Sequence, residues 1–335
     1  MVQGLTSVTT LVTGGAGYIG SHMVLRLCDA GHDVVVLDNL VTGVEWALDP
    51  RATFVLGNAG DQELVGNLIQ KHHISEIVHF AGSIVVPESI SDPLKYYRNN
   101  TATSRNLIEA AVAGGVKHFV FSSTAAVYGM TGLEPVSEDA VLQPISPYGR
   151  SKLMTEWMLA DVANAHPMTF GVLRYFNVAG ADPKKRSGQS TPLATHLIKV
   201  AAQTALGQRE SMSIFGTDFP TPDGTGVRDY IHVWDLVDAH ALLLDHLRHG
   251  GKSLTLNCGY GRGYTVRQVI DTVKDVSGVD FKVIEGPRRA GDPAAVVAQA
   301  DKVRAELGWK PAHDDLHEIV TSAYEWERYL ITRNH

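Results

Sequence analysis

A run of glycines between an apolar stretch and a helical stretch constrains this chain more than any other feature. Residues 8–13 are apolar and rich in β-branched side chains, and residues 21–30 have helical periodicity. Between them stand Gly14, Gly17 and Gly20. A strand that turns tightly into a helix needs glycines for the turn, for close approach to a pyrophosphate and for helix-to-strand contact. The run therefore predicts the first unit of a dinucleotide-binding sheet, and a glycine-rich turn without a ligand is the alternative.

Strands and helices alternate along the first half of the chain. Further strands are expected at residues 34–37, Thr53–Leu56, 76–80, 119–122 and Thr169–Tyr175, with helices at Gln62–His72, 99–113 and 146–163. Strict alternation with short connections implies a parallel sheet covered by helices on both faces. The sequence therefore predicts an α/β fold with a doubly wound parallel sheet.

The composition excludes several classes of protein. The chain has 335 residues, of which 44% are apolar and 19% charged, and it has neither a long apolar run nor a leader-like N-terminus. Cys28 and Cys258 lack the spacing of a zinc site, and so few cysteines are typical of a reducing compartment. The net charge of −7 without basic clusters argues against nucleic acid. We therefore expect a cytoplasmic protein that binds no membrane, nucleic acid or metal.

Tyr148 and Lys152 form a Tyr-x-x-x-Lys pair within a predicted helix. Residues four apart share a helix face, so the lysine ammonium can favour the ionised form of the phenol. A phenol with a pKa near ~10 then becomes a usable base at neutral pH.

Asp38 ends the second strand after the glycine run. A carboxylate at this place accepts hydrogen bonds from an adenosine ribose and repels a 2′-phosphate. NAD is therefore predicted rather than NADP.

Several motifs together resemble a known superfamily. They are GGAGYIGSH at 14–22, DNL at 38–40, HFAG at 79–82, FSST at 121–124, YGRSK at 148–152 and RYFN at 174–177, and they are similar to the extended short-chain dehydrogenases/reductases. The stretches IFGTDFPTPDGTGVRDYIHV at 214–233 and PRRAGD at 287–292 narrow the resemblance to the UDP-glucose 4-epimerase (UDP-galactose 4-epimerase) family. The resemblance runs from about residue 8 to 330.

The resemblance implies a set of residues that contact NAD. They are Gly14, Gly17, Tyr18, Ile19, Gly20, Asp38, Asn39, Leu40, Asn58, Ala59, Phe80, Ala81, Gly82, Asn99, Ser122, Tyr148, Lys152 and Tyr175. Two members of the family pattern differ here. Asn58 replaces a carboxylate that contacts adenine, and Ile84 stands where the family commonly has a lysine, which leaves the tightness of NAD binding open.

The resemblance also implies C4 epimerisation of a UDP-sugar through a transient 4-keto-sugar. Tyr148 would take the proton of the 4-hydroxyl, Lys152 would hold the nicotinamide ribose and lower the pKa of the phenol, and Thr124 would hydrogen-bond the same oxygen. The residues expected to contact substrate are Thr124, Tyr148, Asn177, His196, Leu197, Phe215, Arg228, Tyr230, Arg289, Asp292 and Val296.

Some of these residues have simpler interpretations. Arg228 could form a surface ion pair with Asp229, Phe215 could belong to a core, and His196 could simply fill space. Val296 falls where relatives can have a bulky residue that walls the sugar pocket, so N-acetylated sugars are a possible second substrate class.

The resemblance predicts two domains and a homodimer. Residues 1–176 would form the NAD-binding Rossmann domain, to which part of 223–258 returns, and residues 177–335 a smaller α/β domain for the sugar nucleotide. Helices around 101–113 and 152–163 would pair across a two-fold axis.

Four alternative functions share parts of this pattern. A 4,6-dehydratase would carry an acid pair after the threonine, whereas Ala125 and Ala126 follow Thr124. An epimerase of another UDP-sugar, such as UDP-N-acetylglucosamine or UDP-xylose, would keep every catalytic residue. A non-catalytic NAD-sensing protein would be expected to lack the tyrosine or the lysine, and a simple dehydrogenase would release NADH.

Overall fold

The computed structural model describes residues 8–191, 195–289 and 291–333. Ala290, inside the 287–292 motif, and the N-terminal residues on which the expectation about a leader rests lie outside this range. The chain divides into two compact units. The first unit comprises Met1–Ser123, Ser146–Leu173 and His240–Thr255, and the second comprises Thr124–Ile145, Arg174–Ala239 and Leu256–His335. The domain boundary near residue 176 stays a prediction.

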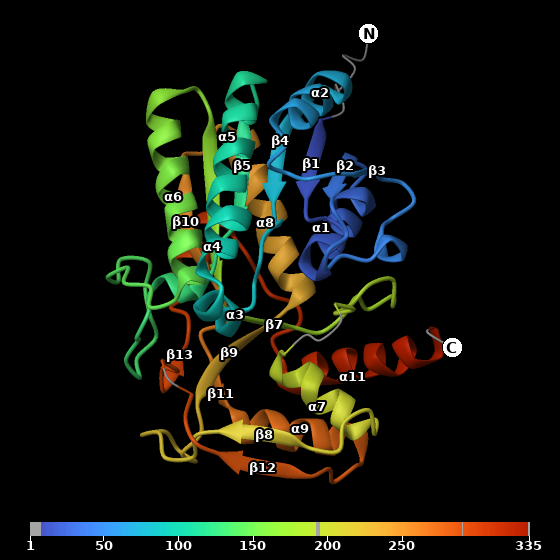
Figure 1. Ribbon diagram of the computed structural model, residues 1–335, viewed down its shortest axis with the longest axis vertical. Helices are drawn as coiled ribbons and strands as arrows, with labels where there is room; N and C mark the ends of the chain where they lie inside the picture. Colours follow the sequence, from blue (N-terminus) through green and yellow to red (C-terminus); the bar gives the residue numbers. More distant parts are fainter. Residues whose placement is uncertain (1–7, 192–194, 290, 334–335) are drawn as a thin grey trace. The chain divides into compact units, whose positions relative to one another are not determined.

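A sheet dominates the first unit (Figure 1). Within the described residues it has seven strands in the order β10-β6-β5-β4-β1-β2-β3, and the pairs among β1 to β6 are parallel. The strands are β1 (Thr9–Thr13), β2 (Asp33–Asp38), β3 (Thr53–Leu56), β4 (Ile74–His79), β5 (His118–Ser122), β6 (Thr169–Tyr175) and β10 (Leu254–Cys258). The predicted doubly wound α/β fold is confirmed.

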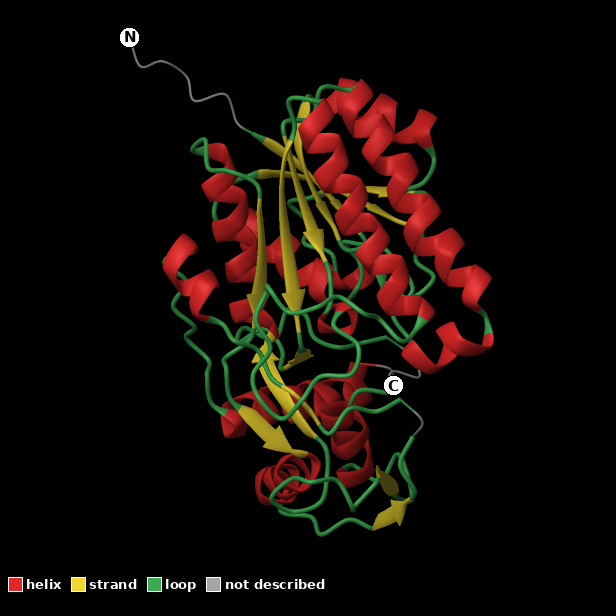
Figure 2. Ribbon diagram, turned by 90° about the vertical axis from the view of Figure 1, so that its left-hand side faces the viewer, coloured by secondary structure: helices red, strands yellow, loops and turns green. Residues whose placement is uncertain are grey.

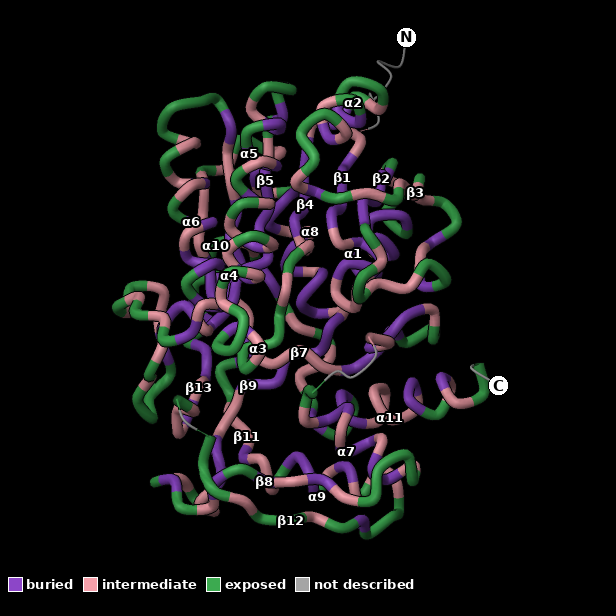
Figure 3. The backbone as a smooth tube through the Cα atoms, viewed as in Figure 1, coloured by how far each residue is buried: buried purple, intermediate pink, exposed green. Residues whose placement is uncertain are grey.

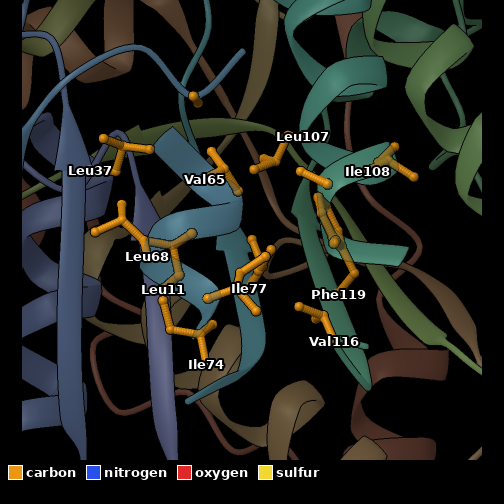
Figure 4. Close-up of a cluster of buried hydrophobic side chains, with 14 of the residues drawn as sticks. Leu11, Leu37, Val65, Leu68, Ile74, Ile77, Leu107, Ile108, Val116 and Phe119 are labelled. Atoms are coloured by element: carbon orange, nitrogen blue, oxygen red, sulfur yellow. The ribbon is translucent and has the colours of Figure 1, made fainter. Parts of the chain in front are cut away.

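Helices cover both faces of this sheet (Figure 2). On one face, α2 (Gln62–His72), α5 (Thr103–Ala113) and α6 (Pro147–Ala165) pack on strand residues in one apolar core. Figure 4 shows part of this core, including Leu11, Leu37, Val65, Leu68, Ile77, Leu107 and Phe119. On the other face lie α1 (Tyr18–Asp29) and the end of α8 (Val233–Arg248), where a Cβ added to Gly171 of β6 would meet Leu243 at 2.5 Å. Because both faces are covered, the central strands are buried along their length (Figure 3).

The helix boundaries have local causes. The Asp61 side chain accepts from the Leu64 N–H to start α2, and His73 in a left-handed conformation ends it. Ser146 caps α6 in the same way, and Pro147 follows at the first helical position. These signals are local in the sequence, which is why both helices were predicted to within about two residues.

The helix predicted at 99–113 begins differently. Residues Tyr97–Ala102 (η2) are wound as a π-helix, and α5 begins only at Thr103. Two short helices, α3 (Val86–Ser91) and α4 (Pro93–Tyr96), precede η2. A π-turn inserts an extra residue, which hydrophobic periodicity does not report, and such turns are frequent at functional sites.

The second unit contains smaller sheets and packed helices. β9 (Val227–His232) pairs with β7 (Asn177–Ala179), β11 (Gly263–Thr265) and β13 (Ala295–Val296), and β8 (Met212–Phe215) pairs with β12 (Val283–Gly286). The helices are α7 (Leu197–Ala205), α9 (Val266–Ser277), α10 (Asp301–Leu307) and α11 (Leu316–Arg333), of which α7, α9 and α11 contact one another. Two short 3₁₀ helices remain, η1 (Glu45–Ala47) in the first unit and η3 (Ala125–Val127) in the second. Among the described residues, no helix combines the length and the apolar character needed to cross a membrane.

Candidate active site

The glycine run lies against the segment that follows β4. Gly14 has a φ of +70°, and a Cβ on it would lie 2.6 Å from the Ala81 nitrogen. A Cβ on Gly20 would lie 2.1 Å from the Gly14 oxygen. Only glycine fits at either place, and β1 and β4 are the neighbouring strands at which the chain order reverses. In open α/β sheets, ligands bind at this switch point.

The N-terminus of α1 fits a diphosphate. Gly17 is its N-cap and has no side chain to satisfy the first N–H groups, and Tyr18 and Ile19 begin the helix. These amide hydrogens and the positive end of the helix dipole suit an anion.

Asp38 organises the loop beside the glycine run. Its Oδ2 accepts from the Ala16 N–H at 2.9 Å, and its Oδ1 accepts from the Leu40 N–H at 2.8 Å. Leu40 has a φ of +57°, which costs a non-glycine residue roughly 1–2 kcal/mol and is held here by that hydrogen bond. Each carboxylate oxygen retains a second lone pair that can accept from a ribose hydroxyl.

Several other predicted NAD contacts of the first unit follow strand ends. The Oδ1 of exposed Asn58 accepts from the Gly60 N–H at 2.8 Å, so the amide hydrogens of Asn58 are the groups left for adenine. Ala59 is buried, Asn39 and Gly82 are exposed, and Phe80 is half-buried. Ile84, in the place of the family lysine, is an exposed apolar side chain.

Tyr148 and Lys152 lie in the first turns of α6, and both are buried. The Lys152 Nζ donates to the Ser122 carbonyl at 3.0 Å and lies 4.9 Å from the centroid of the Phe121 ring. Burial lowers the pKa of Lys152 to about 8, and the Glu156 carboxylate one turn later opposes part of this shift. The direct contacts of the ammonium are thus neutral groups at the carboxyl end of β5, and the Glu156 carboxylate acts on it from farther away.

Two buried residues near this pair were not predicted from the sequence. Tyr96 packs edge-on against Tyr148, with 6.4 Å between ring centroids, and its hydroxyl donates to the Val85 carbonyl at 2.6 Å. Asn100, in the π-helix, accepts from the Ser83 N–H at 2.7 Å and donates to the Ser151 hydroxyl at 3.0 Å. Their neighbour Asn99, a predicted NAD contact, donates to the Ser83 hydroxyl at 3.1 Å. Only the clustering of Asn, Tyr and Pro at 92–100 hinted at such roles.

In the second unit, Thr124 is the N-cap of η3. Its hydroxyl oxygen accepts from the Ala126 N–H at 3.1 Å, which caps η3. Tyr128, at the end of η3, donates to the Asn257 side-chain oxygen at 2.6 Å and accepts from Arg174 at 3.1 Å. Tyr175, the neighbour of Arg174 and a predicted NAD contact, is half-buried at the end of β6.

Arg228 and Asp229 do not form the surface ion pair considered above. Asp229 is buried and accepts from the N–H groups of Tyr260, Gly261 and Ala298, while adjacent strand residues face opposite sides. Arg228 is half-buried, burial lowers its pKa, and Asp292 is close enough to oppose that shift. Val296 of β13 pairs in register with Arg228. Two predicted substrate contacts, Arg228 and Val296, thus lie on neighbouring strands of one sheet, and the third, Asp292, lies near Arg228.

Phe215 is not part of a core. It is 39% exposed, and the Arg289 guanidinium lies 3.7 Å from the centroid of its ring. A flat aromatic face beside an exposed arginine can accept a stacked base next to a phosphate.

The other predicted substrate contacts also lie in the second unit. Asn177 pairs in register with buried Tyr230 across β7 and β9. His196 is the N-cap of α7, Leu197 is its first residue, and the His196 Nδ1 lies 3.1 Å from the Gln189 Nε2. His196 therefore has a specific polar partner. Among the described residues, no group of three or more His, Cys, Asp or Glu side chains is arranged to hold a metal ion.

Comparisons with known proteins agree with this architecture. Residues 10–259 match the family model described as the NAD dependent epimerase/dehydratase family. A UDP-glucose 4-epimerase of Azospirillum brasilense is 55% identical over 328 residues, covering 98% of this chain and 94% of that protein.

Solved structures agree as well. A UDP-glucose 4-epimerase from Brucella ovis in complex with NAD has a TM-score of 0.92 and 39% identity, with 95% and 98% of the two chains covered. One from Stenotrophomonas maltophila, with bound NAD and formylated UDP-arabinopyranose, has a TM-score of 0.93 and 38% identity, with 98% and 100% covered. This chain therefore belongs to the NAD dependent epimerase/dehydratase family, and within it to the UDP-glucose 4-epimerases.

Proposed function

We propose that this protein interconverts UDP-glucose and UDP-galactose by epimerisation at C4. The observation that carries the proposal is the buried ammonium of Lys152, one helical turn from Tyr148 and hydrogen-bonded to the Ser122 carbonyl. A cation held there stabilises the phenolate of Tyr148, which can then remove a hydroxyl proton at neutral pH.

NAD is the cofactor that fits the first unit. The glycines allow the tight turn in which Gly14 approaches the Ala81 backbone, the N-terminus of α1 has no side-chain cap, and Asp38 offers acceptors for a ribose diol. When bound, NAD supplies a reversible hydride acceptor for C4. We assign its remaining contacts to the predicted residues at the ends of β2, β3, β4, β5 and β6.

Tyr148 accepts the proton of the 4-hydroxyl and later returns it to the same oxygen. Thr124 donates a hydrogen bond to that oxygen, and Lys152 stabilises the phenolate before Tyr148 accepts the proton and after Tyr148 returns it. The 4-keto-sugar must present its other face between the transfers, so the protein has to grip the nucleotide and leave the sugar able to turn. Arg228 and Arg289 bind the diphosphate, Phe215 stacks on the uracil, and Asn177, Tyr230, His196, Leu197 and Asp292 bind the rest of the substrate.

The first unit would thus serve NAD and the second the sugar nucleotide. We further propose a homodimer formed through α5 and α6, on which Trp157 is 56% exposed, and a cytoplasmic location. Light scattering on the protein and on a Trp157→Glu variant tests the dimer, and a monomeric wild-type protein would exclude it.

Val296 favours a second substrate class. It is the in-register neighbour of Arg228, and because valine is smaller than the bulky residue that relatives can have there, we assign N-acetylated UDP-sugars as this second class. Pentose sugars, which lack C6, would also fit.

The experiment is to incubate the purified protein separately with UDP-galactose, UDP-N-acetylgalactosamine and UDP-arabinopyranose and to measure each C4 epimer. We expect conversion of UDP-galactose without added NAD and without accumulation of NADH. A protein that leaves UDP-galactose unchanged contradicts the main proposal. One that releases NADH stoichiometrically is a dehydrogenase instead.

A further inference from the structure

A chain of buried polar contacts leads to the N-terminus of α7 in the second unit. Glu327 of α11 pairs with Lys199 of α7, and Lys199 also donates to the Gln189 carbonyl oxygen at 2.7 Å. The side chains of Lys199, Glu327 and Gln189 are all less than one-tenth exposed. Gln189 in turn contacts His196, the N-cap of α7.

The side-chain amide of Gln189 has a definite orientation. The Thr191 backbone N–H lies 3.1 Å from the Gln189 Oε1. A backbone N–H can only donate, so this end of the amide must be the oxygen. The NH₂ group is therefore the end that lies 3.1 Å from the His196 Nδ1.

This orientation decides which imidazole nitrogen carries the hydrogen. An NH₂ group has donors and no acceptor, so the His196 Nδ1 must accept and be unprotonated. In neutral histidine the hydrogen then resides on Nε2. Protonation of the ring would place a hydrogen on Nδ1, so that two donors, Nδ1–H and the Gln189 NH₂ group, would face each other.

The surroundings also favour a neutral ring. His196 is exposed, yet desolvation by the surrounding protein lowers its pKa, and the nearby Lys199 ammonium lowers it further. The charged groups of this cluster are Lys199 on α7 and Glu327 on α11, and they neutralise each other.

We propose that Gln189 is a positioning residue that holds His196 as the neutral Nε2–H tautomer, so that the ring offers a single hydrogen-bond donor and no charge to an acceptor oxygen of the substrate. The role toward substrate rests on the function proposed above, whereas the tautomer does not. Lys199 and Glu327 anchor Gln189 from α7 and α11. A neutral donor recognises a hydroxyl, carbonyl or phosphate oxygen without adding to the positive charge that Arg228 and Arg289 supply.

Gln189→Glu is the sharpest test, because it keeps an oxygen to accept from the Thr191 N–H and replaces the NH₂ donor with an acceptor. Imidazole ¹⁵N chemical shifts are measured in histidine-labelled holoenzyme, and the His196 signals are identified by their loss in His196→Gln. We expect the wild-type ring to carry its hydrogen on Nε2 and to titrate below the ordinary pKa of ~6.5. In Gln189→Glu, Nδ1 becomes protonated near neutral pH and the pKa rises by at least about one unit.

Kinetics provide the second measurement. Gln189→Glu should raise the KM for UDP-galactose by ~10-fold, the scale of one hydrogen bond to a charged or polar acceptor, with kcat changed less. Gln208→Glu is the matched control, because Gln208 is exposed beyond the end of α7 and the change adds the same charge. That variant should alter neither the His196 signals nor KM.

A wild-type His196 with its hydrogen on Nδ1, or charged at neutral pH, overturns the proposal. So does a Gln189→Glu variant whose tautomer and pKa match the wild type. If that variant does not fold, the wild-type spectrum still decides. A wild-type protein with the expected tautomer but no UDP-galactose conversion would contradict the proposed function and leave the tautomer standing.

Discussion

Two buried lysines, one in each unit, are held in opposite ways. Lys152 is 3% exposed and Lys199 is 7% exposed. Lys152 has the Ser122 carbonyl and the Phe121 ring as neighbours, which are neutral, and burial lowers its pKa to about 8. Lys199 is paired directly with the Glu327 carboxylate. A buried ammonium among neutral groups remains able to act on a nearby phenol, whereas one paired with a carboxylate serves as an anchor between helices.

Breaking the Lys199–Glu327 ion pair should have the largest effect, a loss of folding stability. Lys199→Met leaves the Glu327 carboxylate buried without its cation, and removal of one partner of a buried pair typically costs ~3–5 kcal/mol. Urea unfolding of the purified protein measures the loss. The double variant Lys199→Met/Glu327→Met should recover most of the stability, because no charge then remains buried. A single variant as stable as the wild type would show that the pair anchors nothing.

The second largest effect is expected at the phenol beside Lys152. Tyr148→Phe should keep the fold and bound NAD but lose at least ~100-fold in turnover, the usual scale for a general base. Turnover of UDP-galactose and the NAD released on denaturation are measured together. Tyr324→Phe on α11 is the control and should remain active. Near-normal turnover of Tyr148→Phe would refute the assigned role.

The lowered pKa of Lys152 predicts a third effect, a pH dependence of folding stability that Lys152 contributes. Between the folded value of about 8 and the ordinary value of ~10.5, the unfolded chain binds the proton and the folded protein does not. Folding stability therefore gains a contribution as the pH rises through this window, and below about 8 the buried charge lowers stability. The Lys152→Met variant should lack this rise of stability with pH.

The slope is obtained from unfolding curves of both proteins at pH 7.5, 9 and 10 under identical conditions. Other groups titrate in this range, so the difference between wild type and variant is the relevant quantity. If stability changes with pH equally in the two proteins, the pKa of Lys152 is not lowered in the folded protein. Turnover of the wild type should fall as the pH rises through about 8, because the neutral amine no longer stabilises the phenolate.

The smallest effect should come from the support behind Tyr148. Tyr96→Phe keeps the ring that packs on Tyr148 but removes the hydroxyl that donates to the Val85 carbonyl and contacts Glu88. We expect a loss of ~1 kcal/mol in stability and a change in turnover of only a few-fold. Tyr96→Leu, which removes the edge-on contact as well, should reduce turnover more. Equal turnover in the two variants would show that the ring contact does not position Tyr148.

Much of the first unit was predictable because its signals are local. Glycine spacing, strand-like apolar runs and the Ser146-Pro147 start of α6 each lie within a few residues of the element they specify. The π-helix at Tyr97–Ala102 was missed because an inserted residue leaves the apolar pattern almost unchanged. Asn100 was missed for a related reason, since its partners Ser83 and Ser151 are far away in the sequence.

The sequence by itself determined the fold class, the strand–turn–helix unit for a dinucleotide, and the spacing that puts Tyr148 and Lys152 on one helix face. It could not show that the Lys152 ammonium contacts the Ser122 carbonyl whereas Lys199 pairs with Glu327, nor that Asp229 bonds to three backbone N–H groups rather than to Arg228. Nor could it assign a tautomer to His196. Periodicity and turn chemistry are properties of neighbouring residues, whereas burial, charge pairing and hydrogen-bond partners depend on segments that only the folded chain brings together.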